Sequence, residues 1–169
     1  PGVPSIFLFR DPVEVIASVK KATTAALVAK QTAQAGFLAG DSLEKAQEMT
    51  ELEYLAHCYA NYFKAVLKSK QDGLSIIEYP HVTPDNLGVI LSQGLGYPVN
   101  LTHLSRMQEQ FKVHSKDDQG KNIFQDDRKQ KQLSISFDEA QIINETCSRY
   151  IDRLRSAPCN LFKHVAKVA

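Results

Sequence analysis

The sequence lacks an excess of charge of either sign. Lys and Arg number 20 against 19 Asp and Glu, which leaves a formal net charge of +1 over 169 residues. This balance argues against binding nucleic acid by bulk electrostatic attraction, although it leaves room for one small anion site. No apolar run approaches the ~20 residues of a membrane-spanning helix. Because 43% of the residues are hydrophobic, we expect a folded domain with a real core.

Cysteine is scarce, and its spacing excludes the common cysteine sites. Cys58, Cys147 and Cys159 form no CxxC pair, so neither a metal cluster nor a thioredoxin-like redox site is expected. An odd number of widely spaced cysteines fits reduced thiols, which predicts a cytoplasmic protein. Cys58 falls on an apolar helix face, where we expect a small core residue.

Motifs of several catalytic sites are absent as well. None of the 5 histidines belongs to an HxH or HExxH pattern, so we expect no zinc site. Asp126 and Asp127 are adjacent, but two neighbouring acids are weak evidence for a metal. No serine lies in a GxSxG elbow, so nothing predicts a Ser-His-Asp hydrolase. His81 follows a predicted strand and is either catalytic or, as we favour, a turn residue.

The N-terminal stretch predicts a buried strand that leads directly into a capped helix. Residues 5–9, Ser-Ile-Phe-Leu-Phe, are apolar on both faces, which is typical of a parallel sheet covered by helices on both sides. Asp11 is the expected N-cap of the helix, with Pro12 at N1 and Glu14 at N3. The alanine-rich sequence that follows favours helix to about residue 35.

The rest of the chain predicts many helices and one more strand. Gly36 and Gly40 interrupt the first helical region. An apolar stripe marks a helix over about 42–70, which a Thr50–Glu53 capping box would divide into two. The further elements are a strand at 74–79, a helix at 84–94 with Pro84 at N1, a helix at 101–112, and a last helix at 137–156 capped by Ser136 with Glu139.

These elements predict an α/β fold in a single domain, residues 1–169. Two strands that are apolar on both faces cannot shield each other as an isolated sheet. Either their pairing partners lie outside this chain, which we favour, or the count of strands is too low. The polar and charged segment 114–132 predicts a long loop or flap.

The junction between strand 5–9 and its helix is the strongest candidate for a binding site. Ligands of doubly wound sheets bind at the carboxyl ends of the strands, which is where Arg10 stands. Ser18 returns to nearly the same helix face as Asp11, about two turns along. A guanidinium fork and a hydroxyl that converge there suit a phosphate. The alternative is that Arg10 caps the sheet edge or pairs with Asp11 or Glu14, and that Ser18 is an ordinary helix-surface residue.

The stretch FLFRDPVEVIAS, residues 7–18, resembles the 3′-phosphate-binding segment of sulfotransferases. In that family a strand ends in Arg-Asp-Pro, and a serine follows eight residues after the arginine. Both bind the 3′-phosphate of the sulfate donor, 3′-phosphoadenosine-5′-phosphosulfate (PAPS). Arg10 and Ser18 match this pattern residue for residue. Residues 74–98 are similar to the family's next strand and helix, and residues 114–132 with the final helix look like the C-terminal loop of some bacterial-type members.

The resemblance implies a helix-rich part of a P-loop-like three-layer fold with a parallel sheet. It implies sulfuryl transfer from PAPS to a hydroxyl or amine acceptor, without a metal. Lys116, Gly120 and Lys121 would close over the donor phosphate.

No stretch of the chain matches the family's 5′-phosphosulfate loop, whose usual place is upstream together with the catalytic His or Glu. The resemblance therefore implies the C-terminal part of a larger domain, inactive alone, with the acceptor and the catalytic base unknown. Two alternatives stay open. One is a non-catalytic nucleotide-binding remnant, and the other is a helical interaction module that binds a partner through the stripe at 42–70.

Overall fold

The computed structural model describes residues 2–20, 25–69, 72–111 and 133–163. The chain divides into two compact units. Unit 1 consists of Pro1–Phe9, Gln71–Asp127 and Arg155–Ala169, and unit 2 consists of Arg10–Lys70 and Arg128–Leu154. The predicted flap at 114–132 lies outside the described residues.

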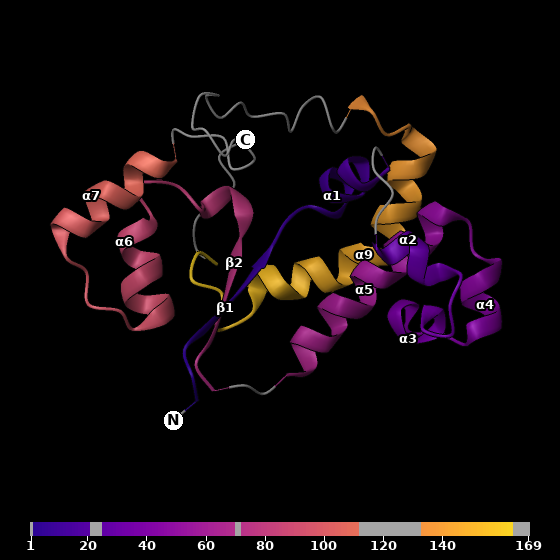
Figure 1. Cartoon of the computed structure of the whole chain (residues 1–169), viewed down its shortest axis with the longest axis horizontal. Coiled ribbons are helices and arrows are strands. Elements are labelled where there is room, and N and C mark those ends of the chain that lie inside the picture. Colours follow the sequence, from indigo (N-terminus) through magenta and orange to yellow (C-terminus); the bar gives the residue numbers. More distant parts are fainter. Residues whose placement is uncertain (1, 21–24, 70–71, 112–132, 164–169) are drawn as a thin grey trace. The chain divides into compact units, whose positions relative to one another are not determined.

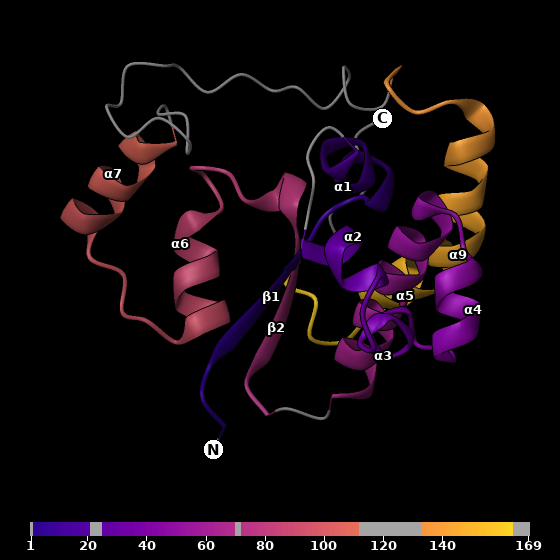
Figure 2. The same cartoon turned by 45° about the vertical axis from the view of Figure 1, so that its right-hand side comes forward.

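Unit 1 contains a parallel pair of strands, β1 (Ser5–Phe9) and β2 (Leu74–Glu78), which lie side by side in Figures 1 and 2. A parallel bridge joins Ile76 to Asn160, and the Leu161 amide donates to the Ile76 carbonyl. The Ile76 amide also donates to the Cys159 carbonyl, at 2.9 Å. Both backbone groups of Ile76 thus face the C-terminal segment, so β2 lies between that segment and β1. Both predicted strands are confirmed to within one residue, and the sequence missed this short third segment.

The parallel pairing confirms the coarse α/β class. Within the described residues, β1 has a strand neighbour on one edge only. Phe7 and Phe9 are buried on one face of β1, with ring centroids 6.4 Å apart. Leu8, on the opposite face, is 47% exposed. The strand was expected to be covered on both faces. The face that carries Phe7 and Phe9 is covered, whereas Leu8 on the other face is exposed.

The predicted helix over 84–94 is wrong at its start and in its type. After β2 the chain forms a 3-10 turn, η1 (Tyr79–His81). The helical part of 84–94 begins only at Leu87, with the short α6 (Leu87–Val89), and continues as a π-helical turn, η2 (Ile90–Gly94). The Asn86 amide donates to the Thr83 hydroxyl, and this local turn delays the helix past Pro84. The predicted helix at 101–112 is confirmed as α7 (Leu101–Gln110).

The described part of unit 2 is built of helices. They are α1 (Pro12–Val19), α2 (Ala25–Lys30), α3 (Ala35–Ala39), α4 (Leu43–Glu48), α5 (Glu51–Lys68) and α9 (Phe137–Ser156). The Thr50–Glu53 capping box divides α4 from α5 as predicted, and Ser136 with Glu139 caps α9. The alanine-rich stretch expected to be helical to about residue 35 contains α1 to Val19 and α2 from Ala25 to Lys30. Gly36 lies inside α3 instead of interrupting it.

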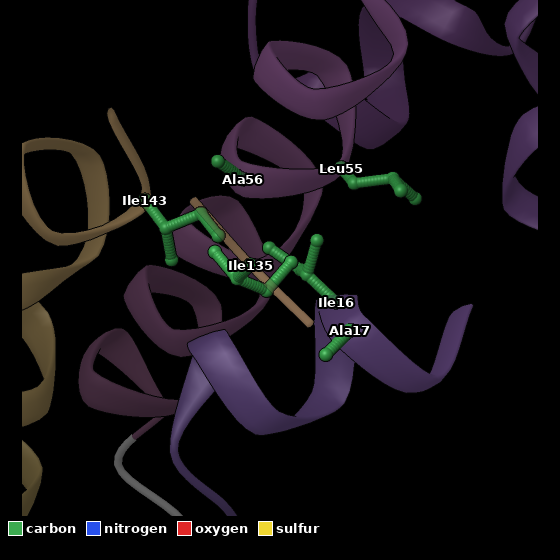
Figure 3. Close-up of a cluster of buried hydrophobic side chains, with 6 residues drawn as sticks. All are labelled: Ile16, Ala17, Leu55, Ala56, Ile135 and Ile143. Carbon is green, nitrogen blue, oxygen red and sulfur yellow. The ribbon is translucent and has the colours of Figure 1, made fainter. Parts of the chain in front are cut away.

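The core of unit 2 joins three of these helices. Ile16 and Ala17 of α1 pack with residues of α5 and α9, and all six buried members of the cluster are at most 8% exposed. Ile16 and Ile143 point toward Ile135 in Figure 3. The apolar stripe predicted along 42–70 contributes Leu55 and Ala56 to this cluster. Burial of this face therefore positions α1, which carries the candidate site.

A second cluster in unit 2 surrounds Tyr54, which packs with Ala35, Ala39 and Ala46. Tyr54 is fully buried, and within the described residues its hydroxyl makes no hydrogen bond of ordinary geometry, although the Cys58 thiol lies beside it. Burial, with a smaller effect of the Cys58 thiol, raises the pKa of Tyr54 to about 12. A buried polar group without a partner costs about 1–3 kcal/mol of stability.

Replacing Tyr54 with phenylalanine is therefore expected to leave the free energy of unfolding unchanged or to raise it by about 1 kcal/mol. The pKa of Tyr54 rises from its ordinary 10.0 to about 12 on folding. The wild type should consequently lose stability relative to the variant as the pH rises through this interval, since the unfolded chain ionises first. Urea unfolding at neutral pH and above pH 10 measures both effects.

Tyr97 is exposed, so Tyr97→Phe is the matched control. It should change neither the free energy of unfolding at neutral pH nor its dependence on pH. A clear loss of stability in Tyr54→Phe at neutral pH would show that the hydroxyl makes a favourable bond.

Among the described residues, no helix combines the length and the apolar character needed to cross a bilayer. Cys58, Cys147 and Cys159 are all free thiols. Cys58 is half-buried, whereas Cys147 lies in the core of unit 2 and donates its thiol to the Ala56 carbonyl at 3.4 Å.

Candidate functional site

The candidate phosphate site lies at the start of α1. Asp11 is the N-cap as predicted, and its Oδ1 accepts the Val13 amide at 2.9 Å. Pro12 follows at N1, where it suits the first turn of a helix. Arg10 immediately precedes this N-cap, and its Nε–H donates to the Glu14 carboxylate at 2.7 Å. The arginine is thereby drawn over the first turn of the helix.

Ser18 also bonds to Glu14. Its hydroxyl donates to the Glu14 carbonyl at 3.2 Å, within the second turn of α1. Arg10 and Ser18 thus each contact the same residue, one at its carboxylate and the other at its carbonyl. Residues four apart on a helix share a face, so Glu14 and Ser18 lie on one side of α1, and Arg10 reaches this side through the Glu14 carboxylate. The Arg10–Glu14 pair is also the alternative that the sequence left open.

The environment of Glu14 explains why the arginine is held so closely. The Glu14 side chain is 8% exposed, and that of Arg10 is 24% exposed. A carboxylate removed from water is costly unless a cation and hydrogen bonds compensate it. Arg10 supplies that compensation through Nε. The guanidinium carries five N–H donors in a planar fork, so its terminal nitrogens have the geometry to meet a phosphate edge.

The other predicted contacts to the donor lie outside the described residues. These are Lys116, Gly120 and Lys121, and the adjacent acids Asp126 and Asp127 also lie there. His81 stacks on Phe162 with ring centroids 5.1 Å apart, and its carbonyl accepts the Asn86 side chain at 2.9 Å. Its ring therefore has a packing role in the turn after β2. In the part of the chain that the structure describes, no three His, Cys, Asp or Glu side chains gather as a metal site would require.

A pocket of about 380 Å³ lies within unit 2, between α3 and α5, and we refer to it as the aromatic pocket. Its lining residues are Phe37, Leu38, Cys58, Tyr59, Asn61, Tyr62 and Ala65. Asn61 Nδ2 donates to the carbonyls of Phe37 at 3.0 Å and Leu38 at 3.2 Å, and thereby caps the C-terminal end of α3. The sequence does not predict this pocket, because nothing in the local pattern shows that α3 folds back onto α5.

Comparisons of this chain with protein-family models, with curated proteins and with solved structures found no match.

Proposed function

We propose that this chain supplies the 3′-phosphate site of a PAPS-dependent sulfotransferase, with Arg10 and Ser18 as the phosphate ligands. The observation that carries the proposal is the attachment of both side chains to Glu14, through bonds of 2.7 Å and 3.2 Å. They lie on one side of a helix that follows a parallel strand, where nucleotide phosphates bind in related topologies. The resemblance of residues 7–18 to the family's segment supports the same assignment.

The ion pair with Glu14 prepares the arginine for this task. In the proposed complex the arginine fork forms a bidentate contact with the 3′-phosphate while Glu14 accepts from Nε. The Ser18 hydroxyl would exchange its bond to the Glu14 carbonyl for one to a phosphate oxygen. This exchange costs little, because a helix carbonyl retains its backbone amide partner.

In the proposed reaction Arg10 and Ser18 anchor the nucleotide and take no part in bond making. The sulfur–oxygen bond to the donor phosphate breaks while a bond forms to an acceptor oxygen or nitrogen, whose proton goes to a base. The products are the sulfated acceptor and 3′-phosphoadenosine-5′-phosphate. The proposal places Lys116, Gly120 and Lys121 over the donor. It assigns the 5′-phosphosulfate loop and the base to the rest of a P-loop-like three-layer fold.

The test compares two nucleotides that differ only in the 3′-phosphate. Isothermal titration of the intact protein should show tighter binding of 3′-phosphoadenosine-5′-phosphate than of adenosine 5′-phosphate. Arg10→Ala should weaken the first about ten- to hundredfold and leave the second unchanged, because a charge-assisted hydrogen bond contributes about 1.5–3 kcal/mol. Arg10→Lys keeps a cation beside Glu14 but loses the fork, and should weaken binding less.

Arg106→Ala removes an exposed arginine from α7 and is the matched control, with no expected change for either nucleotide. Circular dichroism confirms that each variant remains folded. Equal affinities of the wild type for the two nucleotides, or an equal loss of both in Arg10→Ala, would refute the assignment of Arg10.

A further inference from the structure

The aromatic pocket is remote in sequence from Arg10 and plays no part in the proposed donor site. We propose that it binds a neutral aromatic molecule of two fused rings. This proposal rests on the size, the lining and the mouth of the pocket, and it does not depend on sulfuryl transfer.

Size sets the number of rings. The pocket offers about 380 Å³ and is open to solvent at its mouth. An apolar cavity of about 150 Å³ binds a single benzene ring, and small-molecule sites usually span about 300–1,000 Å³. The aromatic pocket therefore has room for two fused rings. It is too large for one ring to fill with close contacts on all sides.

The lining sets the chemistry. Its three aromatic residues, Phe37, Tyr59 and Tyr62, are accompanied by Leu38 and Ala65, and no lining residue carries a formal charge. A charged ligand would lose its hydration there without an ionic partner, which disfavours it. Aromatic faces and edges favour a planar aromatic guest in offset or edge-to-face contact. A neutral phenol can both donate and accept a hydrogen bond, so the tyrosines can bind a ligand hydroxyl.

The mouth of the pocket exposes aromatic side chains to water. Phe37 is 82% exposed and Tyr62 is 58% exposed, although both line the pocket. Deeper in, Tyr59 contacts Phe63 edge to face, with ring centroids 5.9 Å apart. Burial raises the pKa of Tyr59, so its hydroxyl stays neutral. A planar guest would cover the exposed rings at the mouth and gain the contact area that they now offer to water.

The contact between α3 and α5 that forms the pocket is present without a ligand. Asn61 on α5 bonds to two carbonyls at the end of α3. Gly40 ends α3 with φ +72, and a Cβ at this position would lie 2.6 Å from Asn61 Oδ1. The glycine thus permits the close approach that fixes the two helices against each other. A preformed pocket pays little conformational entropy on binding.

The test uses 2-naphthol as the probe. The chain has no tryptophan, so naphthol emission can be excited and followed without indole interference. We expect saturable binding with one site per chain. Naphthalene-2-sulfonate, which has the same rings and a charge, should bind at least about tenfold more weakly.

Three variants locate the site. Phe37→Ala removes an aromatic side chain from the mouth of the pocket. It should weaken 2-naphthol binding about three- to tenfold, as expected for the loss of one aromatic contact. Ala65→Phe fills the pocket and should abolish binding. Phe137→Ala is the matched control, since Phe137 is also 82% exposed but does not line the pocket, and its affinity should equal that of the wild type.

Non-saturable binding of 2-naphthol would overturn the proposal, and so would unchanged binding in a folded Ala65→Phe variant. An equal loss in Phe37→Ala and Phe137→Ala would show adsorption to exposed rings. Analytical ultracentrifugation covers the remaining alternative: a dimer that Phe37→Ala dissociates would show that a second copy occupies the pocket. None of these outcomes bears on the affinity for 3′-phosphoadenosine-5′-phosphate, so the two proposals succeed or fail separately.

Discussion

Replacing Ile16 with alanine should lower the free energy of unfolding by about 2–5 kcal/mol. Ile16 is fully buried at the meeting point of α1 with α5 and α9, where it packs with Leu55 and Ile143 (Figure 3). The substitution removes three carbon atoms and leaves a cavity. The cavity could close only if α1, α5 and α9 moved toward one another. Urea unfolding followed by circular dichroism measures the loss.

The matched control for Ile16 is Val28→Ala. Val28 also lies on a helix of unit 2, in α2, but is 58% exposed, so its truncation should change stability by at most about 0.5 kcal/mol. A loss below about 1 kcal/mol for Ile16→Ala would show that the cluster is not closely packed. Because Ile16 lies between Arg10 and Ser18 in sequence, a loosened α1 should also weaken binding of 3′-phosphoadenosine-5′-phosphate.

Replacing Gly36 with alanine should destabilise the protein by about 3 kcal/mol, the upper end of the usual cost of overpacking. An added Cβ would lie 2.8 Å from both the Asp41 carbonyl oxygen and the Leu43 amide nitrogen. These are backbone atoms of the turn that joins α3 to α4, so no side chain can simply rotate away. The turn itself would have to shift, and with it the Asp41 amide that donates to the Gly36 carbonyl at 3.0 Å.

Gly88 provides the matched control, because it also lies within a helix, α6. A Cβ there would meet only Leu104 Cδ2, at an ordinary 3.7 Å. Gly88→Ala should therefore stabilise the protein by about 0.5–1 kcal/mol through the higher helix propensity of alanine. The two substitutions are chemically identical, so opposite signs in thermal unfolding test the contacts of Gly36 directly. Equal effects would contradict the close approach in the α3–α4 turn.

The candidate site shows how much of its geometry is local. The spacing of Ser18 from Asp11 predicted that Ser18 returns to the face of the N-cap, and the length of Arg10 predicted that it reaches this face; each of the two bonds to Glu14. Helical periodicity determines such a relation within two turns. The pairing of Glu14 with Arg10 was one of the alternatives that the sequence left open, and it joins residues four apart in the chain. The low exposure of the Glu14 carboxylate, which makes a cation beside it favourable, was not predictable from the sequence.

The sequence by itself determined where several helices begin. Asp11, Thr50 with Glu53, and Ser136 with Glu139 cap their helices as predicted. These signals are reliable because a cap is complete within four residues and needs no distant segment. The sequence also determined both strands, since their apolar runs are short and bounded by turn residues. It overestimated the helix at 84–94, where the Thr83–Asn86 turn competes with the first helical bonds.

Only the tertiary structure decided which segments meet. The bridge between Ile76 and Asn160 joins residues far apart in the chain, and α3 lies against α5 to form the aromatic pocket. No periodicity encodes these contacts, because each depends on the combined packing of several helices or strands rather than on neighbours along the chain. Local hydrogen bonds determine where helices and strands form. Burial of apolar surface, which is non-directional, determines which of these helices and strands pack together.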